Sequence, residues 1–375
     1  MKKKTDEFFG DGFFEWQYSK ERKEVWATRC YNPDLYWGGF KKPIPADYEL
    51  PSWAIKGFTK YEGNPIFMPD PNGWDCGFHS GGVHNGSVVF HNGKYWYLYR
   101  GERPYHKIEA KEISGDIALK IDYICDIGVA VSDDGITFSR YKGPLFREGE
   151  DEKYSFEDVC CVRYDGTYYL FCNRWDWSNP VDPKHSGIFL ATSKDLLCWQ
   201  KRGLVFPNAT RMHRNACVLQ TPTNDAVRCN GKFVMYINDG LIAYSDDMIN
   251  WKSEEIPIRW SGGEGCFALA DFSKENPDDI ILFTGGHHTG HFYAIGEVLL
   301  SKTKPELPRD VLYRPVLCAE EAYPWEYGYS TEGKPISDWR DTVFFTGMTK
   351  LGDRLAVYYG GSEYYTCLAF SDKIF

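Results

Sequence analysis

The sequence predicts an all-β protein, and specifically a five-bladed β-propeller with an irregular N-terminal extension. Aromatic residues make up 17% of the 375 residues, and Gly and Asn/Asp turns recur among them, which suits short strands better than helices. A unit of strand, turn, aromatic strand and further strand pair recurs along the chain. No stretch of helical period interrupts these units. Such repetition is typical of propellers, in which a closed ring of blades protects most strand edges.

The chain is predicted to begin with an irregular N-terminal extension, which the propeller domain follows. Residues 1–62 are rich in aromatic residues, proline and charge, and we expect them to pack on the main domain or on a neighbouring subunit. The sequence therefore leaves association with a second copy open. Residues 63–375 form the predicted propeller domain. Its five units run through residues 83–141, 156–203, 215–253, 280–301 and 343–372.

Turn residues mark the hairpins within these units. Asp165-Gly166 separates two β-patterned runs, and Asn-Gly steps do the same in the first and third units, which is a strong hairpin signal. Three units also share an Ala-x-Ser-x-Asp turn that begins at Ala130, Ala191 and Ala243. These shared turns favour repeated blades over unrelated strands.

Composition excludes several classes of function. The net charge of −10 argues against nucleic acid and anionic membrane surfaces as partners, and no apolar stretch is long enough to span a membrane. The basic start of the chain lacks the apolar run of a secretory signal. The twelve cysteines lack zinc-like pairs and are interpreted as small buried hydrophobes in a reducing cytoplasm. We expect a cytoplasmic protein with a small-molecule partner and no cofactor.

The acidic pair Glu157-Asp158 stands just before the hairpin at Asp165-Gly166. A carboxylate at the start of an inner strand would face a site shared by the whole ring. Cleaving a glycosidic bond needs an acid for the departing oxygen and, with inversion, a carboxylate that activates water, roughly 6.5–9.5 Å away. Asp158 is the candidate acid, and the alternative is an Asp that caps a turn. Glu264, between glycines, is the candidate base, with Glu157 and Glu326 as rivals.

Six segments carry a resemblance to a known family: Asn64-Pro65-Ile66, Asn85 with Arg100, Glu157-Asp158, His213-Arg214-Asn215, Tyr293-Ala-Ile-Gly, and YYGGSE at 358–363. They resemble glycoside hydrolase family 130, five-bladed propellers that include β-mannoside phosphorylases and β-mannosidases. The likeness covers about residues 63–372 and implies a glycosidase-like domain. It also implies that the proton of Asp158 reaches the leaving oxygen through a hydroxyl of the bound sugar. The implied substrate-binding residues are Asn85, Arg100, Glu157, Arg214, Asn215, Asn238, His287, Tyr293 and Glu363.

The departures from the family pattern concern the second substrate. The usual Glu-Asp-Pro-Arg reads Glu157-Asp158-Val-Cys here, and the last Asp becomes Glu363. At two positions where the phosphorylases carry an Arg and a His, this sequence has Asn238 and Thr284. Phosphate would thereby lose strong charge-assisted contacts. The pattern favours water over phosphate as the acceptor.

Three main functions therefore stay open, beside a fourth, a furanosidase of the other five-bladed hydrolase families, for which the sequence shows no clear trio of carboxylates. The first is an inverting glycosidase that removes a β-linked mannose or similar hexose from a short oligosaccharide. The second is a phosphorylase that uses Arg214, Tyr293 and a histidine of the tract at 287–291 to hold phosphate. The third is a propeller that binds glycans without cleaving them. The histidine tract is interpreted as a polar loop near the channel, so no metal is expected.

Overall fold

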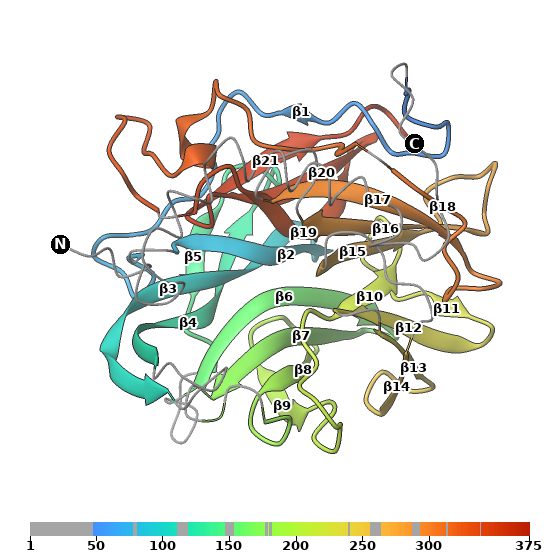
Figure 1. Cartoon of the computed structure of the whole chain (residues 1–375), viewed down its shortest axis with the longest axis horizontal. Coiled ribbons are helices and arrows are strands. Elements are labelled where there is room, and N and C mark those ends of the chain that lie inside the picture. The colour runs from blue at the N-terminus through green and yellow to red at the C-terminus, as the bar shows by residue number, and fades with distance from the viewer. Residues whose placement is uncertain are drawn as a thin grey trace.

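Antiparallel sheets make up nearly all of this computed structural model, as Figure 1 shows. The structure describes residues 48–77, 81–110, 119–146, 154–176, 179, 182–238, 241–255, 264–286, 293–312, 314–337 and 339–375. For residues 106–110, 119–122, 255 and 264 it describes the backbone only. Within these ranges the only helical element is a 3-10 turn, η2 (Pro324–Tyr327). The predicted all-β class is confirmed.

The first two sheets are four-stranded meanders. The first contains β2 (Val83–His91), β3 (Lys94–Ala110), β4 (Leu119–Ser132) and β5 (Ser139–Lys142). The second contains β6 (Tyr154–Tyr164), β7 (Thr167–Asp176), β8 (Gly187–Ser193) and β9 (Trp199–Leu204). Asp165 and Gly166 both have positive φ, 47° and 64°, as a two-residue hairpin loop requires. The Asp-Gly step therefore forms the predicted turn.

A larger sheet follows, in which two antiparallel groups meet at one parallel pair, β10 with β15. The first group holds β10 (Cys217–Gln220), β11 (Arg228–Cys229), β12 (Lys232–Ile237), β13 (Leu241–Ser245) and β14 (Trp251–Glu255). The second holds β15 (Glu264–Ala270), β16 (Asp279–Gly286), β17 (Ala294–Ser301) and β18 (Asp310–Val311). The parallel pair divides this sheet into two units like the first two sheets.

The last sheet takes a strand from each end of the described chain. It contains β19 (Val343–Leu351), β20 (Arg354–Gly361), β21 (Tyr365–Phe370) and, beside β21, β1 (Thr59–Lys60). The buried Lys60 Nζ lies 2.6 Å from Glu326 Oε2, and the Tyr359 hydroxyl donates to Glu326 Oε1 at 2.7 Å. This buried ion pair fastens β1 to the segment before β19.

The first strands of the successive groups pack in a closed circuit: β2 on β6, β6 on β10, β10 on β15, β15 on β19, and β19 on β2. In Figure 1 the sheets extend outward from the region where these strands lie. The contact between β19 and β2 depends on glycine, since a Cβ on Gly347 would lie 2.1 Å from the Gly86 carbonyl oxygen. The circuit brings the starts of segments far apart in sequence to one place.

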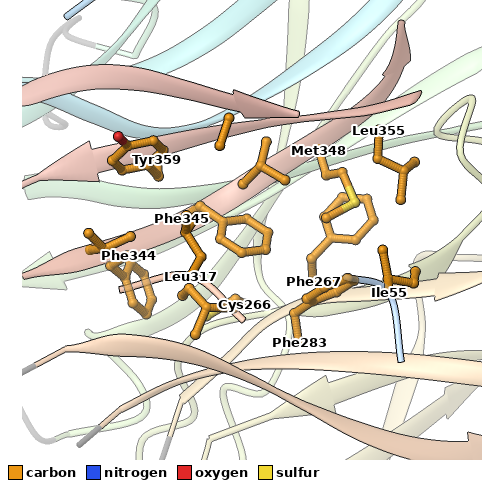
Figure 2. Close-up of a cluster of buried hydrophobic side chains, with 14 of the residues drawn as sticks. Ile55, Cys266, Phe267, Phe283, Leu317, Phe344, Phe345, Met348, Leu355 and Tyr359 are labelled. Carbon is orange, nitrogen blue, oxygen red and sulfur yellow. The ribbon is translucent and has the colours of Figure 1, made fainter. Parts of the chain in front are cut away.

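Buried apolar clusters fill the spaces between neighbouring sheets. Adjacent residues of β6 alternate between two such clusters, because successive side chains of a strand point to opposite faces. Figure 2 shows the cluster between the β15–β17 and β19–β21 groups, where Phe267 and Phe283 pack against Phe345 and Met348. The strands β8, β16 and β17 are therefore buried along their whole length, whereas the outer strand β5 is exposed.

The shared Ala-x-Ser-x-Asp motif forms a hydrogen-bonded turn in the second sheet. Asp195 Oδ1 accepts from the backbone N–H groups of Leu197 and Cys198 at 2.9 and 2.8 Å. The Ser193 hydroxyl oxygen accepts from the Leu196 N–H at 2.9 Å. These backbone hydrogen bonds lower the pKa of Asp195 to about 2. The ionised carboxylate is thus the form that stabilises the turn.

We predict that Asp195→Asn lowers the free energy of unfolding by about 1 kcal/mol at pH 7, a small effect because the side chain is exposed. The pKa of Asp195 is lower in the folded protein than its unfolded value of about 3.9. The ionised carboxylate therefore stabilises the folded state above that pH, and this stabilisation is lost as the pH falls towards 2. Urea unfolding of wild type and variant between neutral and acid pH measures the difference. A difference that does not shrink in acid would contradict this assignment.

Candidate active site

Asp158 lies in a β-bulge of β6, where the regular pairing with β7 is interrupted between Glu157 and Cys160. Its φ is 53°, in the left-handed region that Asp and Asn tolerate better than other non-glycine residues. In a regular strand two successive side chains would point to opposite faces. The bulge explains why the carboxyl groups of both Glu157 and Asp158 come within 4 Å of the Arg100 guanidinium.

Carboxamide side chains hold the Asp158 carboxylate from both sides. Asn85 Nδ2 donates to Oδ1 and Asn173 Nδ2 donates to Oδ2, each at 3.0 Å. Asn173 also donates to Asn215 Oδ1 at 2.6 Å and accepts from the Asn215 backbone N–H at 2.8 Å. Asn85 and Asn215 share the left-handed backbone of Asp158, with φ of 44° and 57°. A continuous hydrogen-bonded chain thus joins β2, β6, β7 and the segment before β10.

Arg100 is buried among acidic groups. Its Nη2 lies 3.5 Å from Glu102 Oε2 and 3.8 Å from Glu157 Oε1, and its Nη1 lies 3.9 Å from Asp158 Oδ1. These separations exceed a hydrogen-bond length, whereas its Nε donates to Cys125 Sγ at 3.2 Å. Glu363, whose φ is 55°, is near enough for its charge to raise the pKa of Arg100.

Burial decides the protonation of this cluster. Burial raises the pKa of Glu157. The positive charge of Arg100 lowers this pKa, and the carboxyl group of Asp158 raises it further. Burial also raises the pKa of Glu102 to about 8, again against the pull of Arg100. Burial disfavours the Arg100 charge, but the surrounding acidic groups prevail and its pKa is raised. A buried carboxyl group whose pKa is raised beside a fixed cation is often found at a functional site.

The remaining predicted substrate-binding residues are placed as follows. Arg214 is half-buried, and its carbonyl oxygen accepts from the Asn238 N–H at 3.2 Å. Asn238 is 3% exposed, and its Oδ1 has no partner among the described residues. Tyr293 packs edge-on against Phe344, with ring centroids 5.6 Å apart. Five of the predicted residues thus form one cluster near Glu363: Asn85, Arg100, Glu157, Asp158 and Asn215.

The candidate bases differ in what the structure describes. Glu264 begins β15 and pairs through its backbone with Gly285, but its side chain lies outside the described part of the chain. His287 also lies outside the described residues. The rival Glu326 is fully buried against Lys60, so its carboxylate is occupied in the ion pair that fastens β1. Of the rivals, only Glu157 lies beside Asp158.

Two members of the cluster were not predicted from the sequence, Asn173 and Glu102. Asn173 interrupts the apolar, aromatic run of β7, and Glu102 follows Arg100 by two residues, on the same face of β3. A polar residue inside a run that is otherwise buried is the signal that could have found both. In the described residues, no group of three His, Cys, Asp or Glu side chains could hold a metal ion. None of the described helical structure is long and apolar enough to cross a membrane.

The adjacent carboxyl groups of Glu157 and Asp158, beside two carboxamides and an arginine in an all-β scaffold, form the candidate active site. No family model matches the chain. A 1,2-β-oligomannan phosphorylase of Thermoanaerobacter sp. (strain X514) is 29% identical over 80% of this chain and 92% of its own length. A β-1,2-mannobiose phosphorylase of the same organism is 26% identical, over 84% and 97%.

A solved structure extends the comparison to the fold. That structure represents the GH130 family of mannoside phosphorylases, which contains glycoside hydrolases that target β-1,2 mannosidic linkages in Candida mannan. It superposes with a TM-score of 0.67 at 22% identity, covering 86% of this chain and 95% of the other. The resemblance to glycoside hydrolase family 130 is confirmed.

Proposed function

We propose that this protein is an inverting glycoside hydrolase that removes a terminal β-linked mannose, or a similar hexose, from short oligosaccharides. The observation that carries the proposal is the Asp158 carboxylate, held between Asn85 and Asn173 and 3.9 Å from Arg100. The substrate class rests on the two curated relatives, which are named for β-1,2-linked mannosides.

In this proposal the cluster divides into an acid and a set of sugar-binding groups. Asp158 supplies the proton for the departing oxygen, by way of a hydroxyl of the bound sugar, as the family resemblance implies. Glu157, whose pKa burial raises, is the adjacent group able to return a proton to Asp158. Asn85, Arg100, Arg214, Asn215, Asn238, His287, Tyr293 and Glu363 are the proposed contacts of the substrate.

The proposed base is Glu264, at the start of β15, which follows β6 and β10 in the circuit of first strands. An inverting reaction needs room for a water molecule, so the two carboxyl groups should stand roughly 6.5–9.5 Å apart. Glu157 is the rival, but its position directly beside Asp158 favours proton exchange with that residue over activation of a water on the far side of the sugar. If Glu264→Gln loses its activity and Glu157→Gln loses less, the result would support Glu264 as the base and Glu157 as the partner of Asp158 in proton exchange.

The charge around Arg100 favours water over phosphate. Glu102, Glu157, Asp158 and Glu363 face one guanidinium, and a phosphate dianion would be repelled by those that are ionised. Thr284 and Asn238, at the positions where the phosphorylases carry His and Arg, are buried, neutral and each has a side-chain oxygen without a partner among the described residues. Such oxygens suit a water or a sugar hydroxyl.

We therefore predict that cleavage of a β-mannoside proceeds at the same rate with and without added phosphate, and yields free mannose. Incubation of a β-1,2-oligomannoside in phosphate-free buffer and in buffer with phosphate, with product analysis by chromatography, measures this directly. Absolute dependence on phosphate, with release of a sugar 1-phosphate, would contradict hydrolysis while leaving the site itself intact.

That outcome corresponds to the second candidate, a β-mannoside phosphorylase. It is favoured by the comparisons, because both curated relatives are named phosphorylases. Arg214 and Tyr293 would then hold phosphate together with His287 or a neighbouring histidine. Substitution of Arg214 by Gln should raise the KM for phosphate in this case, whereas hydrolysis predicts a change in the KM for the glycoside.

We also propose that the scaffold is a five-bladed β-propeller over residues 63–375, with residues 1–62 as its extension. The support is the closed circuit of first strands, from β2 through β6, β10, β15 and β19. In this arrangement the Asp158 bulge faces the central channel, where the substrate binds.

A further inference from the structure

Glu102 is the most deeply buried carboxyl group beside Arg100. It is 1% exposed, and its Oε2 lies 3.5 Å from Arg100 Nη2 and 3.7 Å from Cys125 Sγ. Its Oε1 is also buried and has no partner among the described residues. The chain passes tightly over this carboxyl group, since a Cβ on Gly81 would lie 2.2 Å from Oε2. The proposed function gives this residue no task.

The charge balance around Arg100 requires that some of its acidic neighbours be neutral. One guanidinium faces the carboxyl groups of Glu102, Glu157, Asp158 and Glu363. Burying several carboxylates against one cation is costly, and the group least accessible to water is the one that most readily keeps its proton. An ionised Glu102 would compete with Asp158 and with the substrate for the same guanidinium.

We propose that Glu102 is a positioning residue for Arg100: in its protonated form it leaves the guanidinium available to Asp158 and the bound sugar, and in its ionised form it draws the guanidinium away from them. This inference rests on the proposed function for its effect on catalysis. The step is a loss of one proton from Glu102 to water, with no bond formed in the substrate.

Several titratable groups face Glu102 and fix the direction of the effect. They are Arg100 on β3, Cys125 and Tyr123 on β4, Glu157 on β6, and Glu363 and Tyr364 after β20. Burial raises the pKa of Glu102 to about 8 despite the opposing charge of Arg100, and Glu157 and Glu363 raise it further. The proton is therefore held at neutral pH and lost as pH rises through about 8.

The test compares pH profiles of kcat/KM on a β-1,2-mannoside for wild type, Glu102→Gln and Glu297→Gln. Glu297 is the matched control, because burial also raises its pKa but its carboxylate accepts from the Ile55 N–H, away from Arg100. Wild type should lose activity above about pH 8. Glu102→Gln, which cannot ionise, should keep the neutral-pH rate within about threefold and move the descending limb up by at least about one unit. Glu297→Gln should keep the wild-type limb.

An unchanged alkaline limb in Glu102→Gln would overturn the proposal, as would the same shift in Glu297→Gln. A readout that needs no turnover separates this inference from the proposed function. Infrared difference spectra should show a carboxylic acid C=O band that disappears near pH 8 in the wild type and is missing in Glu102→Gln. If Glu102→Gln does not fold, absence of any band that disappears near pH 8 in the wild type still overturns the proposal, and Glu157→Gln and Glu297→Gln, which should both keep that band, exclude those two residues as its source. If the band is present but no glycoside is cleaved, only the proposed function fails.

Discussion

Asp158→Asn is expected to lower kcat on a β-mannoside with a sugar leaving group by about 10²–10⁴, the range that a general acid contributes. The amide has nearly the same shape but has no proton to deliver to the departing oxygen. It also presents an N–H₂ group to one of the two donors, Asn85 or Asn173, that now face carboxylate oxygens. The measurement is steady-state kinetics on the variant and the wild type, with thermal unfolding to verify that both are folded.

A second substrate separates an acid from a residue that only maintains the bulge. A nitrophenyl mannoside has a leaving group that needs little protonation, so Asp158→Asn should lose much less activity on it than on the disaccharide. Asn173→Ala is the matched structural control, since it removes one carboxamide contact but leaves the proton donor. It should slow both substrates by similar factors. Equal losses on both substrates for Asp158→Asn would contradict the acid assignment.

Lys60→Ala is expected to give the largest loss of stability, about 3–5 kcal/mol, because it leaves the buried carboxylate of Glu326 without its cation. The side chains of Lys60 and Glu326 are 2% and 0% exposed, so water does not replace the lost contact. The pair joins β1 to the segment before β19, and its loss should release β1 from β21. Urea unfolding followed by circular dichroism measures the change.

Lys232→Ala supplies the control for that measurement. Lys232 pairs with Asp246 at 2.9 Å, but the two side chains are 50% and 77% exposed, so its loss should cost less than about 1 kcal/mol. The double variant Lys60→Met, Glu326→Leu should be more stable than Lys60→Ala, because no uncompensated charge stays buried. Similar small losses in Lys60→Ala and Lys232→Ala would refute the role of the buried pair.

The fold could be predicted in large part because local signals repeat. Asp165-Gly166 forms the expected turn, and the apolar run after Asp158 supplies both faces of β6 to two packed clusters. The bulges were not predictable, since a bulge depends on how two strands pair and both strands must be known. The bulge in β6 is nevertheless what brings the carboxyl groups of both Glu157 and Asp158 within 4 Å of the Arg100 guanidinium.

The candidate site could be predicted where its residues stand on first strands or match the family spacing. Asn85, Arg100 and Asp158 were found in this way or by family spacing, and the structure brings their side chains together. Asn173 and Glu102 lie on second strands, and their contacts with Asp158 and Arg100 appear only once the strands are paired. The ion pair between Lys60 and Glu326 could not be predicted for the same reason, since 266 residues separate the two in sequence.

The most direct test of the central claim is an early-time proton NMR spectrum of the mannose released by the wild type and by Asp158→Asn from the methyl glycoside of β-1,2-mannobiose, whose blocked reducing end contributes no free anomers. Hydrolysis with inversion at the Asp158 site predicts that the wild type releases the α-anomer first and that the variant releases almost none. Release of the β-anomer by the wild type, or an equal rate from Asp158→Asn, would contradict the account.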